Sequence, residues 1–286
     1  MHAPTLKLIP GRPAMQHFPP SGQALAHLVI APAMAVSQRF YRDFAQYMAQ
    51  QGFAVTTFDY LGMGEAGGGE LRACRADISE WIEKDADAVL QSVHQAAHGA
   101  PVFLLGHSLG GQVAPLLPSQ HLLAGVVNIA VGSGHASHNR PDVARRAPLL
   151  WHVLTPLLCP LFGYFPGKRI GVMGDIPKQA FYQWRRWCLS PEYVLSGEPG
   201  AREAYARAAW PVLGLTFTDD ELLNEAGSRL LHGAYRSGRV DYREIGPQQY
   251  KLARIGHFGF FKDSMRDSLW PLVVEWLRAQ LQAPRA

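Results

Sequence analysis

The segment Val102–Ala114, VFLLGHSLGGQVA, most restricts the folds open to this 286-residue chain. Its apolar start predicts a buried strand, and the residues from about Leu109 predict a helix. Between the two stand Gly106, Ser108 and Gly110, each separated from the next by one residue. A turn this tight leaves no room for side chains at the two glycines, and it raises the Ser108 hydroxyl above the end of the strand. The segment therefore predicts a serine nucleophile on a strained turn.

Two alternatives compete with this interpretation of Ser108. One is a glycine-rich turn that carries an inert serine. The other is a phosphate-binding loop, but the spacing fits neither Gly-x-Gly-x-x-Gly nor a loop that ends in Gly-Lys-Ser/Thr. The strand–turn–helix context favours the nucleophile, because backbone N–H groups and the helix dipole at a helix N-terminus stabilise developing negative charge.

Apolar runs alternate with helical patterns along most of the chain, and 48% of the residues are hydrophobic. Strands are predicted at 27–31, 53–60, 101–106, 122–132, 211–217 and 239–245. Helices are predicted at 37–52, 77–99, 181–189, 202–210, 221–235 and 271–281, with Ser37 and Asp77 as N-caps. Strands without polar alternation that are separated by helices predict an α/β fold, a mostly parallel sheet with helices on both faces.

The strand–helix alternation stops after Gly134 and resumes at Pro211. The residues between are rich in Pro, Trp, Tyr and Arg. We therefore expect one core domain, residues 1–133 and 210–286, that carries a helical cap insertion at 134–209.

Net positive charge is confined to the expected insertion. Residues 134–209 hold ten Lys or Arg and five Asp or Glu, a balance of +5, and the rest of the chain holds 17 and 18, a balance of −1. The excess predicts either a solvent-exposed basic face or a surface for an anionic substrate or partner. No basic tail or known nucleic-acid motif accompanies it, so we expect no nucleic-acid partner.

A nucleophilic serine needs a general base, and the base needs an orienting acid. Of the twelve histidines, His232 and His257 follow the late strand that is expected to carry the acid. His232 falls within a predicted helix, whereas His257 falls in a glycine-flanked loop, GHFG, after the last strand. A loop at a strand end reaches the serine more readily than a helix face, so His257 is the predicted base.

The acid is expected directly after strand 211–217, where the sequence TDDE offers Asp219, Asp220 and Glu221. Acidic residues before a helix are also ordinary N-caps. Capping explains one acidic residue at this place better than it explains three.

These motifs, in this order, resemble the α/β-hydrolase superfamily over most of residues 25–135 and 210–280. FDYLGMGEAGG (58–68) resembles the Asp-x-x-Gly-x-Gly loop of that superfamily, and IGHFGFF resembles its histidine loop. In such hydrolases with a proline-led late strand, the acid stands nine residues after the proline. The resemblance therefore implies Asp220 rather than Asp219, with the other residue capping the helix.

The resemblance also implies an oxyanion hole. The superfamily usually has His-Gly after the first core strand, and the next residue donates an N–H. Here Pro32-Ala33 stands at that place, which makes Met34 the donor together with Leu109. The chain departs from the family pattern at this loop.

The middle of the chain, GYFPGKRIGVMGDIP followed by WRRWC, resembles the cap of a bacterial branch of predicted serine hydrolases. Trp184 and Trp187 stand three apart and share a helix face. We expect this face to close a pocket over Ser108 while Arg185 and Arg186 face solvent. The alternative is that the tryptophans form the small core of the insertion.

The expected activity is that of a serine hydrolase, an esterase that cleaves a carboxylic ester through an acyl-enzyme, with no cofactor. The expected partner is a small-molecule ester with an apolar acyl group. Two alternatives stay open, a serine peptidase or amidase with the same residues and a non-catalytic binding protein on the same fold. The pair of histidines in HASH (135–138) lacks a third ligand, so no metal is expected.

The remaining expectations concern location. Three cysteines, Cys74, Cys159 and Cys188, suggest no disulfide framework, which fits a reducing compartment. The N-terminal sequence resembles no secretory signal, and no run of about 18 apolar residues predicts a membrane span. A cytoplasmic protein is expected.

Overall fold

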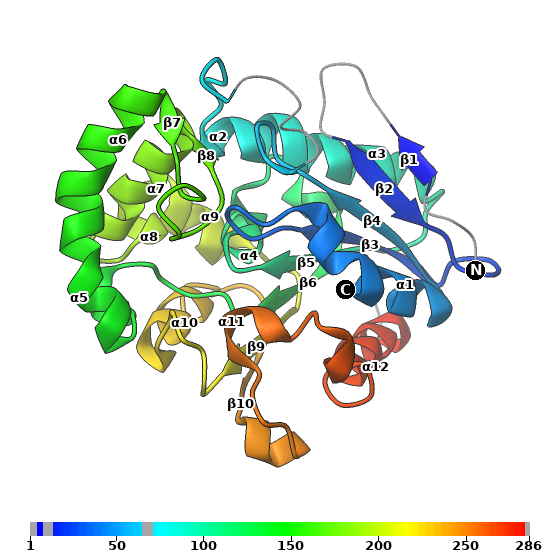
Figure 1. The fold of residues 1–286 in the computed structure, drawn as a ribbon. Coiled ribbons are helices and arrows are strands. Elements are labelled where there is room, and N and C mark those ends of the chain that lie inside the picture. The colour runs from blue at the N-terminus through cyan, green and yellow to red at the C-terminus, as the bar shows by residue number, and fades with distance from the viewer. Residues whose placement is uncertain (1–4, 8–13, 65–70, 284–286) are drawn as a thin grey trace.

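The computed structural model describes residues 5–7, 14–64 and 71–283, and its centre is an eight-stranded sheet (Figure 1). The strand order is β1-β2-β4-β3-β5-β6-β9-β10. The strands are β1 (Thr5–Lys7), β2 (Met15–Phe18), β3 (Ala26–Ala31), β4 (Phe53–Phe58), β5 (Val102–His107), β6 (Leu123–Ile129), β9 (Val212–Phe217) and β10 (Val240–Ile245). The six strands from β4 to β10 are parallel, as predicted, whereas β1 and β2 add an antiparallel edge that the sequence did not predict. Both edge strands are very short, so they carry almost no periodic signal.

The helices of the core follow the predicted positions with shifted ends, except α11, where a loop was expected. They are α1 (Arg42–Gln50), α2 (Ile78–Glu80), α3 (Asp87–Ala96), α4 (Leu109–Gln112), α10 (Glu225–His232), α11 (Gly256–Gly259) and α12 (Trp270–Gln282). A π-helical turn joins α2 to α3, which gives the long helix expected there. Asp77 is its N-cap, since the Asp77 side chain accepts from the Glu80 N–H at 2.9 Å.

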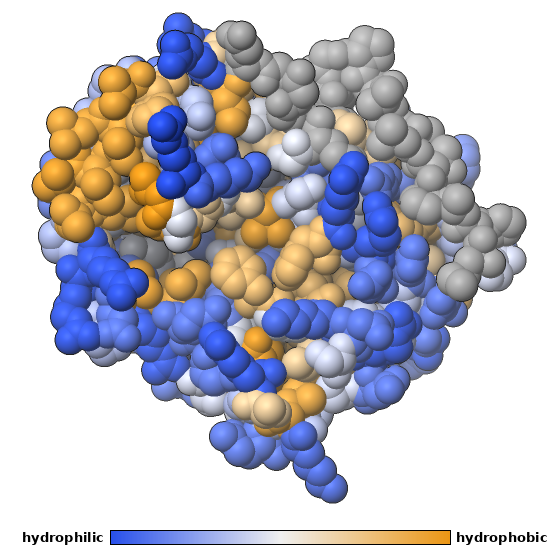
Figure 2. Space-filling model, viewed as in Figure 1, coloured by the Kyte–Doolittle hydropathy of each residue, from blue (hydrophilic) through white to orange (hydrophobic). Residues whose placement is uncertain are grey.

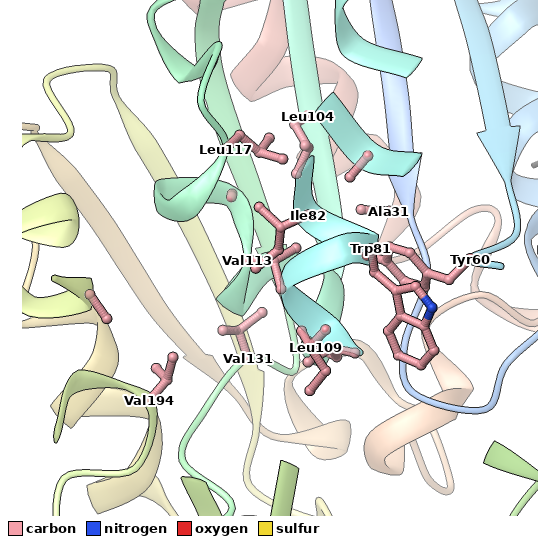
Figure 3. Close-up of a cluster of buried hydrophobic side chains, with 14 of the residues drawn as sticks. Ala31, Tyr60, Trp81, Ile82, Leu104, Leu109, Val113, Leu117, Val131 and Val194 are labelled. Atoms are coloured by element: carbon pink, nitrogen blue, oxygen red, sulfur yellow. The ribbon is translucent and has the colours of Figure 1, made fainter. Parts of the chain in front are cut away.

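Helices cover both faces of the sheet, so alternate residues of each strand enter different clusters. In β5, Leu104 belongs to one apolar cluster and Leu105 to the other. The first cluster holds Trp81 of the α2–α3 helix together with Leu109 of α4 (Figure 3). The second holds Trp270 of α12 beside residues of α1. Burial on both faces explains why the strand sequences show no polar alternation.

The chain between β6 and β9 forms a separate group of helices at one side of the sheet (Figure 1). Its elements are α5 (Pro141–Leu149), α6 (Thr155–Phe162), β7 (Tyr164–Phe165), β8 (Ile176–Pro177), α7 (Lys178–Leu189), α8 (Val194–Gly197) and α9 (Ala201–Arg207). A π-helical turn joins α5 to α6, so the two form one continuous helix. Within the described ranges, no helix has the length and apolar character needed to cross a membrane. We call residues 134–209 the inserted segment.

Candidate active site

Ser108 lies between β5 and α4 in a strained backbone conformation, with φ 50° and ψ −114°. This region of backbone space costs a residue with a side chain about 1–3 kcal/mol, so it persists only where the surroundings enforce it. The Ser108 N–H donates to the Ile129 carbonyl of β6 at 3.0 Å. The N–H groups of Gly111 and Gln112 donate to the Ser108 carbonyl at 3.1 and 3.3 Å. The half-buried serine is thus held on both sides.

The glycines around Ser108 are required because backbone packs directly against backbone. A Cβ atom at Gly106 would stand 2.2 Å from the Gly111 nitrogen. A Cβ atom at Gly110 would stand 2.0 Å from the Ala31 carbonyl oxygen at the end of β3. The second contact fixes the start of α4 against the loop that follows β3. The helix begins at Leu109, as predicted, and ends after one turn at Gln112.

His257 and Asp220 form a buried pair. His257 Nδ1–H donates to Asp220 Oδ2 at 2.7 Å, and the two residues are only 2% and 5% exposed. The other Asp220 oxygen accepts from the N–H groups of Leu222 and Leu223 at 2.8 and 3.0 Å. With Nδ1 engaged as the donor, Nε2 of the neutral imidazole is left as a proton acceptor. His257 lies in the one-turn helix α11 and not in an open loop.

The two neighbouring acids bind the backbone of the same histidine segment. The Asp219 carboxylate accepts from the N–H groups of Ile255 and Gly256 at 2.8 and 3.1 Å. Glu221 accepts from the His257 N–H at 3.0 Å. Hydrogen bonds to ionised acceptors are stronger than neutral ones. All three acids therefore fix the histidine, and Asp220 is the one that contacts its ring.

Asp219 is not the cap of the following helix, so that part of the expectation is wrong. The N-cap of α10 is Asn224, whose side chain accepts from the Gly227 N–H at 3.1 Å. Asp219 instead turns toward the histidine segment. Arg140 also supports the chain after β9. Its guanidinium donates to the carbonyl oxygens of Asp220, at 2.8 Å, and of Thr218.

His107, directly before Ser108, connects three parts of the site. Its Nε2–H donates to the His257 carbonyl at 3.0 Å, and its Nδ1 accepts from the Tyr41 hydroxyl at 2.9 Å. The Tyr41 oxygen accepts in turn from the Ala33 N–H at 2.9 Å. Complete burial holds the pKa of His107 well below its ordinary value, so the ring stays neutral. Sequence reasoning missed this network, because nothing local signals a bond between distant segments.

The two expected oxyanion donors lie where α4 meets the loop after β3. Within the described residues, neither the Met34 N–H nor the Leu109 N–H donates to another group of the protein. The Tyr41 bond fixes Ala33 on one side of Met34. On the other side, Ala35 takes the left-handed conformation, φ 62°, which costs a non-glycine residue about 1–2 kcal/mol. The residue aligned with the glycine of the family pattern is Ala33, and the left-handed conformation falls two residues later, on Ala35.

The inserted segment is joined to α4 through Gln112, the last residue of that helix. Tyr193 donates its hydroxyl to Gln112 Oε1 at 2.9 Å, and Tyr205 donates to the Gln112 carbonyl at 2.8 Å. The Trp184 indole N–H donates to the Tyr193 oxygen at 2.8 Å. Tyr193 has φ 56° and ψ −130°, nearly the same strained conformation as Ser108. Sequence reasoning found neither of these tyrosines.

The tryptophan pair does not act as one face. Trp187 has no exposed surface and donates its indole N–H to Glu198 at 2.8 Å, so it belongs to the core of the inserted segment. Trp184 remains partly exposed and packs edge-to-face on Trp151, with ring centroids 5.3 Å apart. Of the two predicted pocket residues, only Trp184 keeps exposed surface.

Of the two arginines between these tryptophans, Arg186 is exposed, as expected, whereas Arg185 is half-buried, and both bind backbone. Arg185 Nε donates to the Trp151 carbonyl at 2.6 Å, and Arg186 Nε donates to the Gly197 carbonyl at 3.0 Å. Arg186 pairs with Glu198 as well, at 2.7 Å. Both side chains tie helices of the inserted segment together.

The HASH histidines bind serine side chains. His135 Nδ1 lies 2.8 Å from Ser137 Oγ, and His138 Nδ1 lies 2.8 Å from Ser133 Oγ. The part of the chain that the structure describes contains no group of three His, Cys, Asp or Glu side chains placed to hold a metal ion.

His232, the other candidate base, contacts Ser228 and Asn128 and not the residues of the candidate site. Its Nδ1–H donates to the Ser228 carbonyl at 2.8 Å, and its Nε2 lies 3.4 Å from Asn128 Nδ2. Burial lowers the pKa of His232 to about 4. The residue is a neutral histidine of the core.

The parallel sheet, the serine on a strained turn after β5 and the buried Asp–His pair after β9 define an α/β-hydrolase. The model of the family described as serine aminopeptidase, S33, matches residues 22–175, which is more than half of the chain. The protein belongs to that family. The matched residues include Ser108 and end before Asp220 and His257.

Solved structures share the fold at low sequence identity. A soluble variant of monoglyceride lipase from Saccharomyces cerevisiae is 14% identical, with a TM-score of 0.71 over 99% of this chain and 97% of that one. The monoacylglycerol lipase of Paleococcus ferrophilus is 18% identical, with a TM-score of 0.57 over 94% and 99%. A carboxyl esterase from Bacillus coagulans is 11% identical, with a TM-score of 0.61 over 98% of each chain. No curated protein sequence matches the chain.

The contact between Gly110 and the Ala31 carbonyl predicts a severe effect of one methyl group. Gly110→Ala has to displace backbone, so we expect a loss of about 1–3 kcal/mol or more in the free energy of unfolding, measured by urea titration. Gly22→Ala is the control, since a Cβ there meets nothing within 4 Å, and it should leave stability nearly unchanged. Equal stability of the two variants would contradict the close packing described here.

The lowered pKa of His232 predicts a pH-dependent stability. Its pKa in the folded protein lies below that in the unfolded chain, about 6.5, so the unfolded chain binds more protons as the pH falls from about 6.5 to 4. Stability is therefore lost on acidification. In this window His232→Gln should reduce the slope of the unfolding free energy against pH by about 1.4 kcal/mol per pH unit, measured by urea unfolding at several pH values. The control is the exposed His121→Gln, which should keep the original slope.

Proposed function

We propose that this protein is a serine hydrolase that cleaves small-molecule carboxylic esters with an apolar acyl group, through an acyl-enzyme on Ser108. The observation that carries the proposal is the buried bond of 2.7 Å between His257 and Asp220. It supports the roles of general base and orienting acid, because Asp220 holds the ring with Nε2 as the free acceptor. The His107 bond to the His257 backbone ties this pair to the residue that precedes Ser108.

In the first step, Ser108 Oγ attacks the ester carbonyl carbon while His257 Nε2 takes its proton. The carbonyl oxygen gains negative charge, and the Met34 and Leu109 N–H groups donate to it. Among the residues that the structure describes, neither N–H has another protein acceptor, which supports this role. Asp220 stabilises the imidazolium that has formed.

The tetrahedral species then collapses. The bond from the carbonyl carbon to the alcohol oxygen breaks, and the alcohol leaves with the proton from His257. Water attacks the acyl-enzyme while His257 accepts one of its protons. The proton returns to Ser108 Oγ as the carboxylic acid is released, which restores the starting state.

The charges of the inserted segment support a neutral acyl group over a substrate with a free amine. Four of its five acidic residues are already engaged within the segment, by Arg145, Arg202, Arg186 and the Lys168 N–H. An ammonium group placed in a dry site needs a carboxylate partner. The partly exposed Trp184 instead suits an apolar chain. Two lipases and an esterase among the similar structures give the same support.

Peptide or amide hydrolysis is the second candidate, and the family description favours it. The same three residues serve both reactions, so substrate preference decides between them.

Covalent labelling tests the mechanism. We expect a fluorophosphonate probe to label Ser108, with the adduct located by mass spectrometry, and Ser108→Ala to remain unlabelled. Asp220→Asn should slow labelling by roughly 100-fold or more, because the histidine loses its orienting acceptor. Asp219→Asn is the matched control, and its effect should be much smaller, since Asp219 contacts only backbone. An adduct at another residue, or none at neutral pH, would refute the mechanism.

A substrate panel tests the ester assignment. We expect kcat/KM to be higher for p-nitrophenyl octanoate than for p-nitrophenyl acetate, and to be lowest for aminoacyl p-nitroanilides. Trp184→Ala should raise KM for the octanoate by up to about tenfold and change KM for the acetate little, because only the longer chain reaches the indole. Faster cleavage of the anilides than of either ester would assign the protein as a peptidase.

A further inference from the structure

The outer face of the α5–α6 helix carries an exposed aliphatic stripe. Leu149, Val153, Leu157 and Leu161 are 54%, 43%, 63% and 70% exposed. Residues four apart on a helix lie on one face, so these four form a continuous line, which we call the apolar stripe. No Asp, Glu, Lys or Arg occurs in residues 147–167. The face is therefore uncharged along its whole length.

Exposure of large apolar side chains is concentrated in the inserted segment. Six of the eight described large hydrophobic residues that are exposed belong to it: Leu149, Val153, Leu157, Leu161, Val172 and Leu189. Figure 2 shows the resulting apolar patch over α6. Pro148, Pro156 and Pro160 are exposed on the same helix and widen the patch. Contiguous exposed patches of this kind mark interaction sites, whereas single exposed residues do not.

The fold does not need the apolar stripe, because the opposite face of the same helix already packs inward. Trp151, Thr155 and Cys159 are buried, again four residues apart. Trp151 contacts Trp184, the residue proposed to meet the acyl chain. One helix thus lies between the outer apolar stripe and the proposed substrate region.

Positive charges flank the apolar stripe at both ends. Arg145 stands four residues before Leu149, with its side chain 76% exposed and paired to Asp142. Beyond the other end, Lys168 and Arg169 are exposed, and the Arg169 guanidinium lies 5.2 Å from the Phe162 ring centroid. Basic side chains beside an aliphatic helix face bind anionic headgroups while the face enters the acyl boundary.

We propose that the apolar stripe is a docking site for an anionic lipid surface. The exposed basic residues at the two ends of the stripe, Arg145, Lys168 and Arg169, complement such a surface, whereas they would repel one another across a symmetric contact with a second copy of the chain. The idea that this surface supplies an apolar acyl substrate rests on the proposed function. The docking itself requires neither Ser108 nor His257.

Vesicle binding tests the proposal with the full-length protein that carries Ser108→Ala, which separates binding from catalysis. We expect co-sedimentation with phosphatidylcholine vesicles that contain phosphatidylglycerol, and much weaker binding to phosphatidylcholine alone. Leu157→Gln with Leu161→Gln should lower the partition coefficient by at least about tenfold. Arg145→Gln with Arg169→Gln should weaken binding to the anionic vesicles selectively.

Leu25→Gln is the matched control, because Leu25 is 48% exposed and lies outside the inserted segment, and it should bind as well as the parent. Equal melting temperatures verify that the variants fold. Unchanged binding of the Leu157 and Leu161 variant, or no binding by the parent, overturns the proposal. So does a dimer in sedimentation equilibrium that this variant abolishes, which would assign the stripe to a second copy. If vesicles bind but Ser108 is not labelled, the proposed function fails and the docking site stands.

Discussion

The close contact between Gly110 and the Ala31 carbonyl is the constraint on which the candidate site depends. It presses the first turn of α4 against the end of β3, and this leaves Ser108 in a backbone conformation that it would not adopt alone. The same contact brings the Leu109 N–H beside the loop that carries Met34. A single steric requirement thus positions both the serine and the groups that face it.

The histidine segment is fixed by charge and not by regular structure. It is a single turn of helix, which is too short to be stable by itself. Three consecutive acids, Asp219 to Glu221, bind its backbone and its ring, and neutral His107 binds its carbonyl. These bonds replace the support that a longer helix would give. They also explain why an acidic run stands at the end of β9.

The inserted segment is part of the same mechanical unit as the serine turn. Gln112 accepts from Tyr193 and Tyr205, so the last residue of α4 is bonded to the residue before α8 and to α9. The strained conformation of Tyr193 shows that this junction is enforced by its surroundings. The α5–α6 helix packs its inner face against Trp184 through Trp151, and its outer face carries the apolar stripe.

By itself, the sequence determined the order of the parallel strands, the α/β fold class and the need for glycine at 106 and 110, because apolar periodicity and turn sterics are local properties. The motifs added the resemblance to α/β-hydrolases. The sequence also limited the candidates for the acid that orients His257 to three adjacent residues, Asp219 to Glu221. Only the tertiary structure decided that Asp220 contacts His257, that Trp187 lies in a core and that Tyr41 binds His107. These contacts join residues from separate elements, and the directions of their side chains follow from packing and not from spacing along the chain.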